Sequence, residues 1–450
     1  MAETKARHIA NLVEDDGDVK SAHLDNITVT PTAVSDQANT STGYFDVPSG
    51  TEAQRPGSPN AGNLRFNTDL GSLEVHSGTS WVSTNEPTPT IASISGTIYA
   101  GISGRSLTIT GTDFNINNVS IEWLDGTTRI VKEDSITPTS ATSITRTIPA
   151  SVYGKASGTT IGIRVLNAGS VASNIDTSKS VIGLPSGGTE SGLTGGYYYH
   201  TFTTSGNFIV PSGFSVTVDY LLVAGGGGGG YDYGGGGGAG GAIDSTASVS
   251  SSSSPYQIVI GDGGSAGLQN TKRGANGVDS SAFGQTAIGG GGGQGGASAP
   301  GALAATSGGS GGGGGWNLQT PGSGTSGQGN NGGTGNARAS NPVAVGGGGG
   351  KNAQGGNGTN TASGNGGAGI NWKSLGTSYA GGGGGGGYAG YGVTAGSGGT
   401  GGGGDAGLAN LAAQDGSANT GGGGGGDGGG PGLGAGAGGK GVVIIRYQIP

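Results

Sequence analysis

The chain has no cysteine and few charged side chains, and both absences narrow its possible functions. Without cysteine among its 450 residues, it can form neither a disulfide framework nor a thiol-based zinc site. Only 10% of the residues are charged and the formal net charge is −8, whereas a nucleic-acid binder needs a basic surface for phosphate contacts. We therefore expect no nucleic-acid partner.

Long apolar runs are missing as well. Residues 1–20 carry charges throughout and lack the apolar segment of a signal peptide. Elsewhere no apolar run approaches the length needed to span a membrane. If the protein acts outside a cell, we expect it to leave by a route other than conventional secretion.

Recognisable catalytic motifs are also lacking. The four histidines lie in separate segments, and none stands in a frame of the Ser-His-Asp type. Residues 434–440 approach a phosphate-binding loop, but Gly441 replaces the required Ser or Thr and a predicted strand follows. Five isolated carboxylates are interpreted as solvated loop tips rather than as a glycosidase pair, namely Asp232, Asp244, Asp262, Asp405 and Asp415. The sequence predicts no enzyme activity, no cofactor and no metal ion.

What the chain has in excess is glycine. Most of its 112 glycines lie after residue 195, with uninterrupted runs at residues 225–230, 311–315, 381–387 and 421–426. A collagen-like triple helix is excluded, because it needs glycine at every third position with proline between, and the 16 prolines follow no such period. Two interpretations remain: a flexible linker, and packed helices of the polyproline II type made of glycine.

The residues around these runs favour packed helices. Apolar strands are predicted before the first run, at residues 198–202, 207–210 and 216–224, and after the last run, at residues 441–447. A polyproline II helix has three residues per turn and outward-pointing amides, and only glycine lets such helices approach closely on every side. Aromatic residues stand at the ends of the runs, where a linker has no use for them, at Tyr231, Tyr233, Trp316, Trp372, Tyr379, Tyr388 and Tyr391. We therefore expect one folded unit of polyglycine II helices framed by β-strands.

The rest of the chain is predicted to be mainly β and to form separate modules. Residues 3–14 have helix-forming composition within an N-terminal segment of residues 1–49. Residues 88–182 contain short alternating strands separated by turns, the pattern of an immunoglobulin-like β-sandwich. Residues 183–194 are predicted to link this sandwich to the glycine-rich domain of residues 195–450.

Residues 50–85 are predicted to form a β-hairpin module. Leu64 and Phe66 share one face of a first strand, and Leu73 and Val75 share one face of a second. So small a hairpin cannot bury a core alone. It resembles a short module of phage fibre and baseplate proteins, in which copies from three chains bury their aromatic side chains together. The resemblance implies a homotrimer, with contacts from Leu64, Phe66, Leu73, Val75 and Trp81.

Three other parts of the chain, namely the glycine-rich domain, the sandwich and the opening segment, resemble known families. Residues 199–211, 222–230 and 438–447 resemble the frame of the glycine-rich domain at the ends of bacteriophage tail fibres. More loosely, they resemble the glycine-sandwich adhesins of T-even-like phages, whose polyglycine helices present variable loops to a host receptor. The sandwich resembles the IPT/TIG family through residues 110–114 and 165–174. The opening of the chain, from residue 3 through Leu24, Asp25 and Asn26, resembles the starts of virion proteins in phages of marine cyanobacteria.

These resemblances imply a homotrimeric phage tail fibre or fibre tip, assembled in the host cytoplasm. Residues 1–49 would attach to other tail or baseplate proteins, and the glycine-rich domain would bind a host surface glycan or outer-membrane protein. The expected receptor-binding residues are Tyr231, Tyr233, Trp316, Trp372, Tyr379, Tyr388 and Tyr391, although these rings could instead shield the open ends of the glycine helices. Two alternatives stay open: a structural virion fibre or capsid or tail decoration protein without receptor binding, and a glycan depolymerase.

Overall fold

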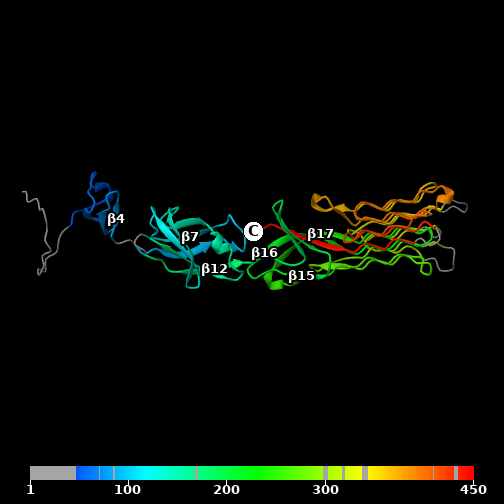
Figure 1. Cartoon of the computed structure of the whole chain (residues 1–450), viewed down its shortest axis with the longest axis horizontal. Coiled ribbons are helices and arrows are strands. Elements are labelled where there is room, and N and C mark those ends of the chain that lie inside the picture. The colour runs from blue at the N-terminus through cyan, green and yellow to red at the C-terminus, as the bar shows by residue number, and fades with distance from the viewer. Residues whose placement is uncertain are drawn as a thin grey trace, which may run out of the picture. The chain divides into compact units, whose positions relative to one another are not determined.

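The structure is a computed structural model, and it describes most of the chain after residue 46. The described residues are 47–69, 71–84, 87–167, 171–296, 303–316, 320–336, 343–408, 410–429 and 434–449. They fall into two compact units, Met1–Glu86 and Pro87–Pro450, which we describe separately. The predicted mainly β fold is confirmed (Figure 1), and no helix in these ranges is long and apolar enough to cross a membrane. The helix expected at residues 3–14 and nearly all of the attachment segment lie outside the described residues.

The first unit is a four-stranded sheet with an apolar face open to solvent. Its strands, in the order β1-β2-β3-β4, are β1 (Ser49–Gly50), β2 (Leu64–Asn67), β3 (Ser72–His76) and β4 (Trp81–Ser83), with a 3-10 turn at Glu52–Gln54. Leu64 pairs with Val75, Phe66 with Leu73, and Val75 with Val82, so these five side chains share one face. We call them the hairpin apolar face. Leu64, Leu73 and Val82 are 41%, 36% and 37% exposed.

The opposite face of this sheet is polar and buried. The Glu74 side chain is fully buried and lies 2.7 Å from Arg55 Nη2 and 3.2 Å from Arg65 Nη1. Trp81 pairs with His76, and their ring centres are 5.3 Å apart on this polar face. Trp81 therefore does not share a face with the other four predicted trimer contacts, because the pairing of β3 with β4 turns its ring away from them.

The second unit begins with a β-sandwich, as the alternating strands predicted. One sheet has the order β10-β7-β5 and the other the order β6-β12-β11-β8-β9. Ile109, Trp123 and Val165 are fully buried in the core that the two sheets share. The elements are β5 (Thr90–Ser95), β6 (Ile98–Tyr99), β7 (Ser106–Thr112), β8 (Val119–Asp125), β9 (Thr128–Ile136), β10 (Ser143–Thr147), α2 (Ala150–Tyr153), β11 (Thr160–Leu166) and β12 (Asp176–Ile182). Its membership of the IPT/TIG family stays a prediction.

The sandwich packs directly against the glycine-rich domain. The rings of Tyr99 and Phe214 are centred 5.8 Å apart within one buried cluster, and Arg105 donates a hydrogen bond to the carbonyl of Ile449 at 3.1 Å. Half of the predicted linker is strand β13 (Thr189–Thr194), which pairs with β14 (Tyr197–Phe202). The stretch 183–194 is therefore part of the folded unit and not a free linker.

A five-stranded sheet opens and closes the glycine-rich domain. Its order is β13-β14-β23-β16-β17, so the last strand of the chain, β23 (Val442–Tyr447), lies between β14 and β16 (Ser215–Val223). The expectation that strands at both ends of the glycine region close one unit is confirmed. The strand predicted at residues 207–210 corresponds to β15 (Gly206–Phe208), and it pairs with β18 (Tyr256–Ile258) and not with its sequence neighbour β14.

Short elements complete this end of the domain, which we call the sheet end. They are β17 (Ala242–Ser250), a 3-10 turn at Ser251–Ser253, β19 (Ser280–Ala282), β20 (Gln285–Ala287), β21 (Ile370–Asn371), a 3-10 turn at Trp372–Ser374 and β22 (Ser378–Tyr379). Glycine-rich segments run from the sheet end to the opposite end of the domain and back (Figure 1). We call that opposite end the far end. It includes the 3-10 turn Ala389–Tyr391.

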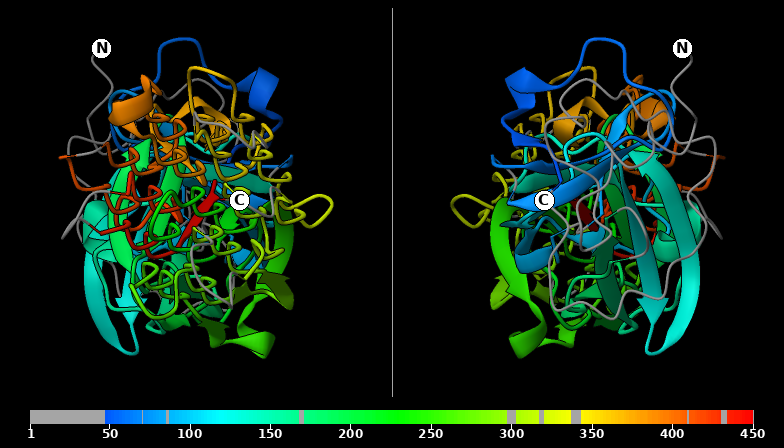
Figure 2. Two further views of the ribbon diagram at one scale, coloured as in Figure 1. Left: turned by 90° about the vertical axis from the view of Figure 1, so that its right-hand side faces the viewer. Right: turned by 90° about the vertical axis from the view of Figure 1, so that its left-hand side faces the viewer.

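The glycine-rich segments are polyglycine II helices joined by backbone hydrogen bonds. In the run 225–230, the N–H groups of Gly225 and Gly228 bond to Val278 and Ala275, those of Gly226 and Gly229 to Gly439 and Gly436, and those of Gly227 and Gly230 to Gly238 and Gly235. Residues three apart in the run thus bond to the same neighbouring segment, as a helix with three residues per turn requires. The same run accepts N–H groups from Gly264 and Gly267, from Gly290 and Gly293, and from Gly424 and Asp427. The left view of Figure 2 shows these segments as small coils lying side by side.

Asparagine and aspartate side chains complete this hydrogen-bond pattern. The Oδ1 atoms of Asn365, Asp405 and Asp415 accept the backbone N–H groups of Ser397, Gly398 and Ala437 at 2.7 to 2.9 Å. Each of these side-chain oxygens accepts a backbone N–H group, as the carbonyl oxygen of a neighbouring glycine helix does inside the bundle. Asp405 and Asp415 are exposed, as expected, but they bridge neighbouring segments instead of standing at loop tips.

Candidate binding surface at the far end of the glycine bundle

A tight turn of three residues, Tyr231, Asp232 and Tyr233, lies at the far end. It joins the run 225–230 to the returning segment, and Asp232 and Tyr233 take left-handed backbone angles, with φ of 61° and 55°. The carboxylate of Asp427 accepts the N–H of Asp232 at 2.9 Å and is only 1% exposed. Burial raises the pKa of Asp427, because it disfavours the charged carboxylate. The buried Asp427 side chain thus holds the backbone of this turn in place.

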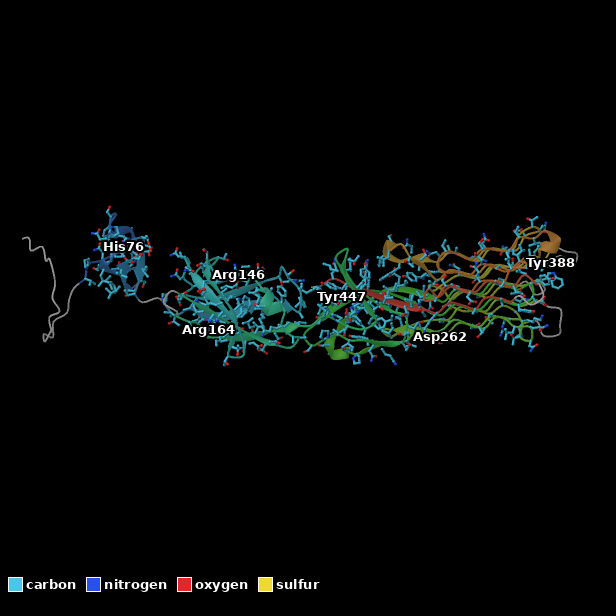
Figure 3. The ribbon with its side chains drawn as sticks, viewed as in Figure 1. His76, Arg146, Arg164, Asp262, Tyr388 and Tyr447 are labelled. Atoms are coloured by element: carbon cyan, nitrogen blue, oxygen red, sulfur yellow. The ribbon has the colours of Figure 1, made fainter. Side chains whose placement is uncertain are left out.

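Three rings from distant segments meet beside this turn. The ring centre of Tyr233 is 5.3 Å from that of Tyr388 and 6.5 Å from that of Trp316, both in edge-to-face arrangements. We call these three residues the far-end aromatic cluster. All three are half-buried, so each ring keeps part of its surface open to solvent. Figure 3 shows Tyr388 at the outermost part of the bundle.

An ion pair borders the cluster. Lys272 Nζ lies 2.8 Å from Asp232 Oδ2 and 4.9 Å from the ring centre of Tyr231, so one ammonium group contacts both a carboxylate and an aromatic face. The turn that carries Lys272 arises from a different part of the chain than the turn of Tyr231. The far end therefore combines aromatic surface, phenolic hydroxyls and a paired charge.

The structure brings together only part of the residue set predicted from the sequence. Tyr231, Tyr233, Trp316 and Tyr388 lie at the far end. Tyr391 ends the 3-10 turn there, but its side chain is outside what the structure describes.

Trp372 and Tyr379 lie at the sheet end, away from the other predicted receptor contacts, and burial excludes Trp372 as such a contact. Trp372 is 1% exposed, belongs to a buried cluster with Leu221 and Ile444, and donates a hydrogen bond from Nε1 to Asp244 at 2.8 Å. Tyr379 lies in β22 and is packed against the same cluster. Aromatic residues adjoin glycine runs at both ends of the bundle. Position beside a run therefore does not show at which end of the bundle a residue lies.

Sequence reasoning missed two residues of this surface, Lys272 and Asp427. Asp427 had a visible signal, because it is a lone carboxylate that interrupts the long glycine stretch 421–430. Lys272 had no comparable signal. Its approach to Asp232 and Tyr231 depends on how the segments are arranged in the bundle.

Comparison with known proteins identifies the part of the chain that carries this surface. A family model for a glycine-rich domain matches residues 201–448. This range starts within β14 and ends just after β23, so it contains the whole bundle and both of its ends. A search among curated proteins found no match. With more than half of its length matched, the chain belongs to the family of proteins that carry this glycine-rich domain.

Proposed function

We propose that the protein is a fibre of a bacteriophage virion that binds the host cell surface through the far end of its glycine-rich domain. The far-end aromatic cluster carries this proposal. Recognition residues usually sit on loops held by a rigid scaffold, and Tyr and Trp rings give a large contact area at low entropy cost. Here the half-buried rings of Tyr233, Trp316 and Tyr388 stand on turns of a bundle whose segments are bonded to several neighbours.

The hairpin apolar face supports assembly into a homotrimer. Its leucine and valine side chains stay partly exposed in the single chain, while the polar side chains of the opposite face are buried and paired. Burial of apolar surface stabilises by about 25 cal/mol per Å² removed from water. Three copies that pack these faces together would remove this surface from water and place three far ends on one fibre.

The other parts have supporting roles in this proposal. Residues 1–49 attach to other virion proteins, and the sandwich, as an IPT/TIG domain, spaces the far end from the particle. The partner at the far end is a host surface glycan or an outer-membrane protein, and the protein binds without cleaving a bond. It resides in the phage tail after assembly in the host cytoplasm.

Binding to host cells tests the function directly. We expect saturable binding of the full-length protein to cells of the correct host, measured by flow cytometry with labelled protein. The triple variant Tyr233→Ala, Trp316→Ala, Tyr388→Ala should bind at least about 30-fold more weakly, because loss of even one central aromatic contact of roughly 2 kcal/mol has that effect.

The control is Tyr379→Ala, which removes a half-buried tyrosine at the sheet end. Both variants are first checked for wild-type thermal unfolding. Equal binding by the triple variant would contradict a role for the cluster. Absence of binding to a host that the parent particle infects would favour a structural fibre.

The oligomeric state tests the trimer. We expect a mass of three chains by sedimentation equilibrium for the wild type, and a monomer for the double variant Leu64→Lys, Leu73→Lys, because two charges per copy would have to be buried. Leu193→Lys changes an exposed leucine of β13 and should leave the mass unchanged. A trimer in the double variant would show that the contact lies elsewhere.

A further inference from the structure

A second surface of the glycine-rich domain lies at the sheet end. It is an open groove of about 720 Å³ between the edge strand β17, the segment 255–257 and the hairpin formed by β19 and β20. That volume falls within the roughly 300–1,000 Å³ of ligand pockets in general. The side chains that line it and can form hydrogen bonds through a hydroxyl or an amide are Thr246, Ser248, Gln257, Ser281, Gln285 and Thr286.

The chemistry of this groove is neutral. Every described residue that lines it is free of formal charge, although the chain as a whole carries a net charge of −8. Its hydroxyl and amide groups can each donate and accept hydrogen bonds. The phenol of Tyr256 is already engaged, since its oxygen lies 2.9 Å from the N–H and 3.3 Å from the carbonyl of Ser250.

Two rings add apolar surface to the groove. Tyr256 and Phe283 are half-buried, with ring centres 5.5 Å apart. Phe283 takes a left-handed backbone angle, φ 51°, at the tip of the hairpin between β19 and β20, where Gly284 follows with φ 76°. Such turns favour Asn-Gly, and a bulky residue with positive φ is uncommon.

This unfavourable conformation positions the Phe283 ring. The ring packs 5.0 Å from Tyr220 and beside Tyr256, and so forms one wall of the groove. Unfavourable backbone angles persist only where the surrounding structure fixes them, and they are enriched at sites where proteins bind ligands.

We propose that this groove binds a neutral oligosaccharide. A sugar ring presents hydroxyl groups at its edge and C–H groups on its faces, which suits a wall of aromatic rings beside hydroxyl and amide side chains. A charged ligand would lose its hydration without meeting an opposite charge. The site is separate from the far end and does not depend on the function proposed for it.

Saturation-transfer NMR on the full-length protein tests the site. The probes are the neutral sugars cellotriose, isomaltotriose and mannotriose, with the anionic trigalacturonate for comparison. We expect saturation transfer to at least one neutral sugar and none to trigalacturonate. The double variant Gln257→Ala, Gln285→Ala should weaken binding at least tenfold, and both side chains are exposed, so the fold should survive.

Two controls separate this site from others. Gln414→Ala removes an exposed glutamine outside the groove and should leave sugar binding unchanged. The triple variant of the far-end aromatic cluster should also retain it. The proposal is overturned if no neutral sugar receives saturation, if trigalacturonate binds equally well, or if the Gln257 and Gln285 double variant binds as tightly as the wild type.

Discussion

Replacement of Gly229 with alanine is expected to lower the free energy of unfolding of the glycine-rich domain by roughly 3 kcal/mol or more. The added Cβ would overlap the carbonyl oxygen of Gly425 and lie 2.5 Å from its carbonyl carbon. Both atoms belong to the backbone of a neighbouring helix, so no side-chain rotation can make room. Gly229 also donates its N–H to Gly436, so moving its own helix would break the hydrogen bonds of that run.

Gly434→Ala is the matched control, and it should behave in the opposite way. A Cβ at Gly434 meets no described atom within 4 Å. Loss of glycine there restricts the unfolded chain, which leaves stability unchanged or raises it by about 0.4–1 kcal/mol. Denaturant unfolding followed by tryptophan fluorescence measures both variants. Equal stability of the two would mean that the helices are not packed as closely as the structure has them.

Substitution of Glu74 by glutamine should strongly destabilise the first unit. It removes the only negative charge that both Arg55 and Arg65 contact among the described residues, and the Glu74 and Arg65 side chains are buried. Breaking a buried ion pair by removing one partner costs about 3–5 kcal/mol, since the remaining charge stays buried without compensation. The control is Glu52→Gln, which also removes a partner of Arg55 but at a half-exposed side chain and should cost at most about 1 kcal/mol.

The pH dependence of this unit provides a second readout of Glu74. The hydrogen bond from Arg55 holds the pKa of Glu74 below its ordinary value of 4.5. A depressed pKa means that the stabilisation is complete above about pH 4.5 and is lost as the pH falls through the folded-state value. Thermal unfolding between pH 7 and pH 3 should show this loss in the wild type, and less of it in Glu74→Gln. An unchanged acid limb in the variant would contradict the role of Glu74.

The sequence predicted much of the glycine-rich domain because its signals are local. The β-branched content of residues 442–447 identified β23, and glycine without a fixed period pointed to polyglycine helices. The end of the bundle at which each turn lies could not be predicted. Outward and returning segments have the same composition, so nothing local distinguished buried Trp372 from half-buried Trp316.

The sequence also could not predict which strands pair over long distances along the chain. The partner of β15 is β18, nearly fifty residues away, rather than its sequence neighbour β14. In the first unit, the turn between His76 and Trp81 makes these two residues partners, and pairing partners share a face. A shift by one residue would have placed Trp81 with Leu73 and Val75, and turn geometry alone decides between the two.

Amide hydrogen exchange at Gly225–Gly230 tests the central claim most directly, because the far end can present a fixed surface only if this run is rigid. All six N–H groups donate to neighbouring helices. We expect them to exchange at least about a thousandfold more slowly than in an unfolded peptide of the same sequence, since opening them requires unfolding of the bundle. Exchange at the rate of the unfolded peptide would show that the glycine region is a flexible linker.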